Sequence, residues 1–385
     1  MIRRDITTEL IESASEYPVV TIFGPRQSGK TTLVRMTFPD RAYFSMENPD
    51  IRLAAETDPL GFLNRLPDGG VLDEIQRAPQ LLSYIQGIVD KNEKPGHFIL
   101  TGSHQPSLQE ALNQSLAGRT AVLTLLPFSL HELRHYQRKS RPFELIVSGF
   151  FPRLHEKNLK PDRFFNGYIQ TYVERDVRAL INLKDLGRFQ QFMVLLAGRV
   201  GQVVNYTSLS NDLGVSSTTI KSWISVLKAS YIIFELPSYF ENIRKRVVKS
   251  PKIYFTDTGL NTHLLGITTD FQAERDRLRG GFYENLVILD ILKTRLNQGK
   301  RPEIYFYRDT HGNEVDLIIR EGRQVVPVEI KSAATFTGSF LKGLDHFKKT
   351  VGERSTAGMV LYNGKEEFEI KGTRIFNPFL SGNQQ

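Results

Sequence analysis

Apolar and polar positions in the first third of the chain alternate between β-branched runs and helical patterns. Apolar residues recur at helical spacing from Ile6 to Ala14, and the run from Val19 to Phe23 follows directly. The same pattern predicts further strands over 41–46, 71–74, 97–103 and 120–126, and helices over 51–56, 60–66 and 108–116. Strands that alternate with helical segments predict an α/β fold.

The middle of the chain is mainly helical in its pattern. Aromatic and aliphatic residues recur at helical spacing over 162–179 and again over 189–199, and packing into a core explains both stripes. A short helix over 207–214 ends at a glycine, a longer helix covers 217–229, and a strand is expected over 231–236. Two helices joined by a glycine turn and followed by a strand resemble a winged helix-turn-helix.

The second helix of this pair has an outer face suited to nucleic acid. It exposes side chains that contact phosphates and base edges in other proteins, namely Ser217, Thr218, Lys221, Ser222, Ser225 and Lys228. The only tryptophan, Trp223, is expected to fill the core. Residues 244–252 form a predicted hairpin with five cations. Duplex DNA is the expected partner, and protein docking is the alternative.

The last third combines a long helix with several strands. A helix is predicted over 280–296, three strands over 303–308, 314–320 and 324–331, then a helix over 341–349 and a strand over 358–362. The order of elements is therefore helix, three strands, helix and strand.

Composition narrows the class of protein. At 385 residues the chain is expected to form two or three domains, and without cysteine it forms neither disulfides nor thiolate metal sites. The formal charge of +8 favours a polyanionic partner, although a solvated basic surface would explain it equally well. We find neither a signal peptide nor an apolar run long enough to span a bilayer, and we expect a cytoplasmic protein without membrane contact.

The segment after the strand at Val19–Phe23 carries the clearest chemistry. It matches G-x-x-x-x-G-K-[ST] with a strand before it and a helix after it, through Gly24, Pro25, Arg26, Gln27, Ser28, Gly29, Lys30, Thr31 and Thr32. Such a loop directs its N–H groups at phosphate. Lys30 would contact the β- and γ-phosphates of ATP, and Thr31 would be a ligand of Mg²⁺. A glycine-containing surface turn is the alternative.

Two acids follow the buried strand over 71–74, at the edge where parallel sheets hold ligands. Asp73 would hold Mg²⁺, directly or through water, and Glu74 would polarise the water that attacks the γ-phosphate. An acidic helix cap is the alternative for this pair. At the end of the next strand, Thr101 or Ser103 would bind the γ-phosphate or the attacking water, unless the two only form a polar turn.

The sequences GPRQSGKTT, VLDEIQ, ILTGSHQ and SLAGRTAVLTLLPFSLHEL together resemble the AAA+ ATPases, within a bacterial group whose C-terminal half is nuclease-like. The resemblance covers essentially the whole chain and implies a five-stranded parallel sheet, a helical lid, and assembly as a homo-oligomeric ring or other multimer. It also implies that Arg119 is an arginine finger for the neighbouring subunit. The alternative is a surface ion pair. Arg153 and Arg175 are both candidates for a lid arginine.

The order of elements in the last third resembles the PD-(D/E)xK nuclease fold. Asp316 and then Glu329 and Lys331 match its signature, and Glu284 could reach them from the preceding helix. The resemblance implies that the three carboxylates bind a second Mg²⁺ or Mn²⁺ and that Lys331 activates the hydroxide. Acids on an exposed strand are the alternative.

These observations predict four regions: an AAA+ P-loop ATPase core over 1–140, a helical lid over 141–200, a winged helix over 201–270 and a nuclease-like domain over 271–385. Two functions are compatible with them. One is an ATPase that binds DNA and couples hydrolysis to processing it. The other is a nucleotide-dependent regulatory switch, or a DNA- or protein-binding module, with an inactive nuclease fold.

Overall fold

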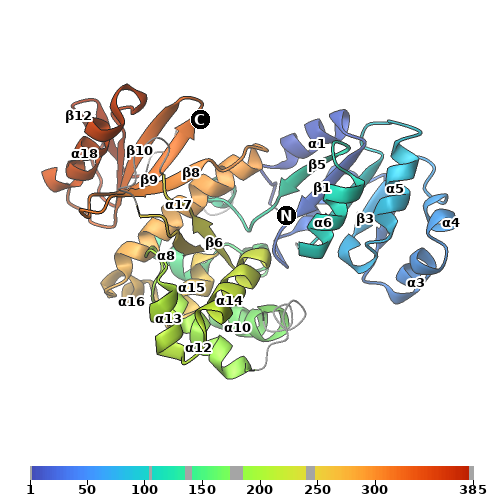
Figure 1. Cartoon of the computed structure of the whole chain (residues 1–385), viewed down its shortest axis with the longest axis horizontal. Coiled ribbons are helices and arrows are strands. Elements are labelled where there is room, and N and C mark those ends of the chain that lie inside the picture. Colours follow the sequence, from blue (N-terminus) through green and yellow to red (C-terminus); the bar gives the residue numbers. More distant parts are fainter. Residues whose placement is uncertain (1, 104–105, 135–140, 174–184, 240–247, 381–385) are drawn as a thin grey trace.

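The computed structural model describes the chain over residues 2–103, 106–134, 141–173, 185–239 and 248–380. An N-terminal α/β unit and a C-terminal unit with a mixed sheet lie at opposite ends of the molecule, and a largely helical middle region lies between and below them (Figure 1). The described part of the chain contains no helix that is both long enough and apolar enough to cross a membrane.

The order and direction of the strands in the N-terminal sheet decide which of its edges can hold a ligand. Its described strands are parallel and follow the order β2-β3-β4-β1-β5. Their bounds are β1 (Val19–Phe23), β2 (Tyr43–Ser45), β3 (Gly70–Asp73), β4 (Phe98–Gly102) and β5 (Thr120–Thr124). In register, Phe23 lies beside Gly102, and Ser45 lies beside Asp73. The carboxyl ends of the strands therefore meet at one edge, which confirms the predicted parallel α/β core.

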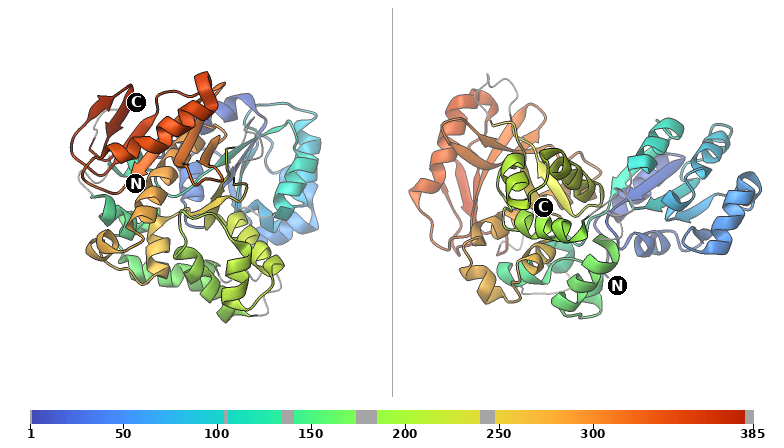
Figure 2. Two further views of the ribbon diagram at one scale, coloured as in Figure 1. Left: turned by 60° about the vertical axis from the view of Figure 1, so that its left-hand side comes forward. Right: turned by 60° about the horizontal axis from the view of Figure 1, so that its bottom comes forward.

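Helices cover both faces of this sheet (Figure 2). The helices of this unit are α1 (Thr7–Glu16), α2 (Lys30–Thr37), α3 (Pro49–Thr57), α4 (Pro59–Leu63), η1 (Ile75–Arg77), α5 (Leu81–Val89) and α6 (Pro106–Ser115). The short helix α7 (Leu130–Arg134) follows β5, and its Leu130 and Leu133 pack into the hydrophobic cluster of the middle region. Because strand residues alternate between faces, Val19 and Phe23 belong to one buried cluster and Val20 and Ile22 to another. The five residues of β1 are all buried.

The middle region begins with helices and contains a short antiparallel strand pair. Its described elements are α8 (Pro142–Ser148), α9 (Pro152–Glu156), α10 (Pro161–Tyr168), η2 (Ile169–Val173), α12 (Leu186–Ala197), α13 (Tyr206–Leu213), α14 (Ser217–Ala229), β6 (Ile233–Leu236), β7 (Lys252–Phe255), α15 (Thr258–Leu264) and α16 (Asp270–Arg275). The helix expected over 162–179 differs, because α10 passes into the π-helix η2. There Thr171 Oγ1 donates to the carbonyl of Gly167 at 2.6 Å, a bond that competes with the helical pattern.

The C-terminal unit is built on a mixed sheet. The described order is β12-β13-β11-β10-β9-β8, in which β8 to β10 are antiparallel and β11 pairs parallel with β10. The elements are α17 (Arg279–Asn297), β8 (Ile304–Arg308), β9 (Glu314–Glu321), β10 (Gln324–Lys331), η3 (Gly338–Leu341), α18 (Lys342–Val351), η4 (Gly352–Arg354), β11 (Met359–Tyr362), β12 (Phe368–Ile370) and β13 (Thr373–Phe376). The predicted order of elements is confirmed, and two strands that were not predicted follow it.

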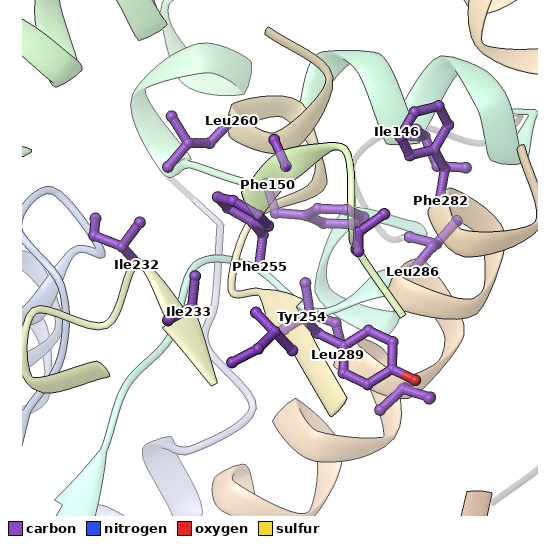
Figure 3. Close-up of a cluster of buried hydrophobic side chains, with 14 of the residues drawn as sticks. Ile146, Phe150, Ile232, Ile233, Tyr254, Phe255, Leu260, Phe282, Leu286 and Leu289 are labelled. Carbon is purple, nitrogen blue, oxygen red and sulfur yellow. The ribbon is translucent and has the colours of Figure 1, made fainter. Parts of the chain in front are cut away.

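One hydrophobic cluster joins the middle region to the C-terminal unit. Figure 3 shows Phe150 and Ile233 of the middle region beside Phe255 of β7 and Leu286 of α17. Trp223 packs against the rings of Phe189 and Phe192 at centroid distances of 5.5 and 5.2 Å, so its predicted place in the core is confirmed.

Asp257, for which the sequence offers no explanation, is the N-cap of α15. Its buried carboxylate accepts hydrogen bonds from the backbone N–H of Leu260 at 3.1 Å and of Phe150 at 2.7 Å. The second bond ties α15 to the segment after α8. Asp257 thus has a structural role, because an N-cap satisfies amide groups that the helix leaves free.

Candidate functional site

The phosphate loop runs from the end of β1 to the start of α2. A Cβ atom on Gly24 would lie 2.1 Å from the carbonyl oxygen of Leu125, so only glycine fits this close approach. Gly29 has a φ of 94°, which favours glycine, and it is the residue from which α2 begins. The predicted strand, loop and helix are therefore confirmed.

Lys30 and Thr31 lie as the motif requires, on the first turn of α2. The Nζ atom of buried Lys30 donates to the carbonyls of Gly24 and Pro25, both at 2.9 Å. Thr31 Oγ1 donates to Asp73 Oδ2 at 2.9 Å. The hydroxyl and the carboxylate that were predicted to share Mg²⁺ are thus in direct contact, although they come from different strand-to-helix connections.

Asp73 is surrounded by hydroxyl groups. Besides Thr31, it accepts hydrogen bonds from the phenol of Tyr43 on β2 and from Thr101 Oγ1 on β4. Burial and the bond to Asp73 raise the pKa of Tyr43 above its ordinary value, so the phenol keeps its proton. Oxygen atoms on neutral partners leave the negative charge of Asp73 uncompensated, which suits a hard cation such as Mg²⁺.

Glu74 lies outside the strand that was predicted to carry both acids. β3 ends at Asp73, and Glu74 adopts a left-handed conformation with a φ of 58°. Its backbone N–H donates to Thr101 Oγ1 at 3.4 Å, and its carboxylate accepts from the side-chain amide of Gln76. The two acids thus have different environments. A non-glycine residue in this conformation is strained, and such residues are concentrated at functional sites.

Several buried polar atoms at this edge of the sheet have no hydrogen-bond partner among the described residues. They are Gln27 Oε1 and Ser28 Oγ in the loop, Gln76 Oε1 in η1, and Ser103 Oγ after β4. Buried polar groups are normally paired, so four orphaned atoms near one edge fit a polar ligand. Of the two hydroxyl residues predicted after β4, Thr101 contacts the acids and Ser103 has a free oxygen.

A pocket of about 330 Å³ opens beside the loop. One wall comes from α2 and its start, with Gly29, Thr32, Leu33 and Met36, and the other from the N-terminal segment and α9, with Ile2, Arg3, Pro152 and Glu156. The lining is mainly apolar with a few charged groups. The pocket thus adjoins the phosphate loop on the side of Thr32.

Arg4 is a candidate functional residue that sequence reasoning missed. Its buried guanidinium donates to the carbonyl of Ser28 at 2.7 Å, to Glu132 Oε1 at 2.8 Å and to the carbonyl of Leu126 at 2.7 Å. In a phosphate loop the N–H groups face the anion, so carbonyls must point away and need other donors. Arg4 supplies one. No local motif marks it, because its partners are 24 to 128 residues away.

Helix α17 contacts the segment that holds Arg4. Lys293 Nζ donates to the carbonyl of Phe128 at 2.7 Å, and Asp290 accepts from the backbone N–H of Leu130 at 2.8 Å. Burial lowers the pKa of Lys293 to about 8, although the carboxylates of Asp257 and Asp290 oppose this shift. The helix therefore connects the N-terminal unit with the C-terminal sheet (Figure 1).

Arg119 lies at the opposite edge of the sheet from the phosphate loop. Its carbonyl accepts from the N–H of Val19 at 3.2 Å, at the amino end of β1. Its guanidinium forms an ion pair with Asp90 and donates to the carbonyl of Ala117 at 3.1 Å. A strand of five residues is about 16 Å long, which exceeds the reach of an arginine. Within one chain, Arg119 therefore does not reach the loop.

The structure does not decide between Arg153 and Arg175 as the lid arginine. Arg153 is exposed on α9, one residue after Pro152, which lies against Gly29. Arg175 lies outside the described residues. A different arginine connects the loop to the middle region, because the guanidinium of Arg26 lies 5.6 Å from the ring centroid of Tyr172 in η2.

The C-terminal acids are gathered around lysines. Lys331 Nζ lies 2.6 Å from Glu329 Oε1 and 3.1 Å from Asp316 Oδ2. Glu284 is paired with Lys252 of β7 at 2.9 Å and accepts a hydrogen bond from the hydroxyl of Tyr254. Burial and the nearby Asp316 raise the pKa of Glu329 to about 8, against the effect of Lys331. The predicted residues are thus close together.

Their arrangement does not fit the expected second metal ion. Among the described residues, no group of three or more histidine, aspartate or glutamate side chains is placed to hold a metal. The physical reason is that ammonium groups of Lys252 and Lys331 already bond the carboxylates of Glu284, Asp316 and Glu329. The geometry of the described residues thus does not support the Mg²⁺ or Mn²⁺ that was expected at this site.

The predicted nucleic-acid face is only partly as expected. Thr218, Lys221, Ser222, Ser225 and Lys228 are exposed on α14, although Lys228 pairs with Glu235 and Lys221 lies over the ring of Tyr206. In the basic hairpin, Lys249 is exposed, but Lys252 is buried and ion-paired, so its expected place in a cationic surface is wrong. Residues 244–247 lie outside the described residues.

Comparisons with known proteins divide the chain into three parts. Residues 16–134 match the family model described as AAA domain, and residues 140–270 and 279–380 match two models described as domains of unknown function. An uncharacterized protein of Mycobacterium tuberculosis is 31% identical over 337 residues, which are 86% of this chain and 74% of the relative. An uncharacterized protein of Haemophilus influenzae is 24% identical, over 72% and 68% of the two chains.

Solved structures are less similar. The Walker-type ATPase of Pyrococcus abyssi has a TM-score of 0.41 and 14% identity, over 68% of this chain and 95% of that chain. AMPPCP-bound DnaA from Aquifex aeolicus has a TM-score of 0.32 and 15% identity, over 58% and 86% of the two chains.

Proposed function

Because this chain belongs to the family of the mycobacterial relative and carries an AAA domain, we propose that it binds ATP with Mg²⁺ and hydrolyses it. The observation that carries the proposal is the contact between Thr31 and Asp73 beside buried Lys30. These residues come from the ends of two strands and supply a hydroxyl, a carboxylate and an ammonium group. Phosphoryl transfer to water needs these groups, since most of its catalysis is positioning and charge stabilisation.

The pocket beside Thr32 would hold the nucleobase. It adjoins the loop that would hold the phosphates, and its apolar walls suit a flat heterocycle. Arg3 and Glu156, which line the wall opposite α2, are among the groups able to hydrogen-bond the edge of the base. This supports a nucleoside triphosphate as the ligand rather than inorganic phosphate alone.

Glu74 would orient the attacking water, and bound Mg²⁺ would neutralise charge on the phosphates. The carboxylate of Glu74 is now bonded to Gln76, so it would have to exchange that partner for water before hydrolysis. Thr101 contacts both Asp73 and the backbone of Glu74 and would hold the two acids in fixed positions relative to each other. Ser103, with its unpartnered oxygen, would donate to the γ-phosphate.

Arg119 would act only in a neighbouring subunit. Its place at the amino end of β5 excludes its own loop, so this role requires the loop of an adjacent copy in a homo-oligomer. Asp90 would release the guanidinium when that contact forms. Arg153 would be a lid arginine, and the start of α9 against Gly29 supports it.

Two functions that would depend on ATP hydrolysis are compatible with the rest of the chain. The first is DNA binding through α14 and the basic hairpin, with the C-terminal unit processing DNA. The second is a nucleotide-dependent switch whose C-terminal unit only binds its target. The lysine pairing of Glu284, Asp316 and Glu329 favours the second for this unit. ATPase rates with and without single- and double-stranded DNA would distinguish a DNA-coupled enzyme from a DNA-independent switch.

The test of the proposal is a pair of substitutions in the loop and the acid. Lys30→Ala is expected to abolish ATP binding, measured with a fluorescent ATP analogue, because the loop loses its phosphate-binding ammonium. Glu74→Gln is expected to keep binding and lower the hydrolysis rate by about 10²-fold or more. Lys91→Ala, at an exposed site, is the control. Unchanged turnover in Lys30→Ala would reject the proposal.

A further inference from the structure

Lys252 lies among the acids of the C-terminal unit, although it belongs to the middle region. It is the first residue of β7, and its side chain is only 3% exposed. The family match that contains Lys252 ends at residue 270, whereas the match that contains the acids begins at residue 279. The cation and its partners therefore come from two parts of the chain.

The ammonium group has a complete set of partners. Its Nζ atom lies 2.9 Å from Glu284 Oε1 and 2.6 Å from Glu314 Oε1, and the ring of Phe306 lies 5.5 Å away. Charged hydrogen bonds of this length are among the strongest in proteins. On the next strands, Lys331 bonds Asp316 and Glu329. Four carboxylates are thus shared by two lysines.

We infer that Lys252 is the built-in cation of this cluster and takes the place that a divalent metal ion would need between its carboxylates. Mg²⁺ demands near-octahedral oxygen ligands and keeps several waters. To admit it, the protein would have to break the bonds of a buried ammonium group to Glu284 and Glu314, and a buried charge without a partner is costly. The cluster therefore locks β7 to α17 and β9 and does not act as a metal-dependent nuclease.

The position of Tyr254 agrees with this assignment. Its fully buried hydroxyl donates to Glu284 Oε1, the same oxygen atom that Lys252 bonds, so both donors come from one face of β7. Two donors on one strand therefore fix this carboxylate to β7.

Divalent-ion binding by the full chain tests this inference. In an Asp73→Asn background, which removes the metal ligand of the nucleotide site, we expect no bound Mn²⁺ by electron paramagnetic resonance without nucleotide. Lys252→Met in the same background should expose the carboxylates and strengthen Mn²⁺ binding by a factor of at least ~10. Lys249→Met, at an exposed lysine three residues away, should leave binding unchanged.

Four outcomes decide whether this inference holds. The inference would be overturned if the Asp73→Asn variant binds one Mn²⁺ and loses it when Asp316→Asn is added. It would also be overturned if Lys252→Met does not raise the affinity for Mn²⁺. If Lys252→Met does not fold, Lys252→Met with Glu284→Gln replaces it, because removing both partners leaves fewer uncompensated charges. If the double variant folds, the result supports the inference that the cluster holds β7 against α17 and β9. A double variant no more stable than the single one would overturn it.

Discussion

The chain gathers carboxylates in two places, and their partners differ in kind. At the edge of the N-terminal sheet, Asp73 is bonded by the hydroxyls of Thr31, Tyr43 and Thr101. In the C-terminal unit, Glu284 and Glu329 are bonded by the ammonium groups of Lys252 and Lys331. A hydroxyl leaves the negative charge available to a metal ion, whereas an ammonium group neutralises it. Carboxylates at similar motif positions thus have different chemistry.

Substituting Asp73, the carboxylate bonded by hydroxyl groups, should have the largest effect on ATP hydrolysis. Asp73→Asn is expected to lower Mg²⁺-dependent ATP hydrolysis on the order of 10³-fold, because the substitution removes a charged metal ligand while keeping the shape. Asp316→Asn, the matched change among the lysine-held acids, should leave hydrolysis unchanged. Steady-state turnover at saturating ATP measures both. Equal losses in the two variants would break the comparison.

The cations allow a second comparison, through pH. Burial lowers the pKa of Lys293 to about 8, although the nearby carboxylates of Asp257 and Asp290 oppose this shift. Lys252, also buried, has a raised pKa because Glu284 and other nearby charges outweigh burial. Between pH 8 and 10.5 the unfolded chain therefore holds a proton that folded Lys293 lacks, and the free energy of unfolding should rise with pH, by about 3 kcal/mol in all.

Denaturant unfolding at several pH values measures this slope. Lys293→Met should reduce it, since the substitution removes the group that titrates differently in the two states. Lys252→Met should not reduce it, because the folded protein keeps that lysine charged over this range. A slope that survives in Lys293→Met would contradict the expected neutral form.

Arg4 extends the comparison to the loop itself, with a smaller effect on the nucleotide than that of Asp73. Arg4→Ala removes the donor to the carbonyl of Ser28, and we expect nucleotide affinity to fall about tenfold. It also leaves Glu132 buried without its cation, which should destabilise the fold by about 3 to 5 kcal/mol. Arg4→Met with Glu132→Gln should recover stability without recovering affinity. Affinity that returns with stability would reduce Arg4 to a structural role.

The sequence predicts the parts of the molecule in which neighbours along the chain decide the structure. The β-branched run at Val19–Phe23, the glycines of the loop and the helical spacing around Trp223 are local signals, and each gives the element that the structure contains. The strand before Glu74 was predicted one residue too long, because the turn after Asp73 depends on contacts with Thr101.

The sequence does not predict partners that lie far apart along the chain. Tyr43 lies 30 residues from Asp73, and Lys252 lies 32 residues from Glu284. Neither belongs to a motif, yet each decides what its carboxylate can bind. This is why a signature such as Asp316 with Glu329 and Lys331 indicates a fold more securely than an activity.

The number of Mn²⁺ ions per chain, counted by electron paramagnetic resonance with a non-hydrolysable ATP analogue, tests the comparison most directly. Because hydroxyls bond Asp73 whereas a lysine bonds Asp316, we expect one Mn²⁺ ion per chain. This ion should be lost in Asp73→Asn and kept in Asp316→Asn. A second ion in the wild-type chain that disappears with Asp316→Asn, or an ion that stays bound in Asp73→Asn, would contradict the account.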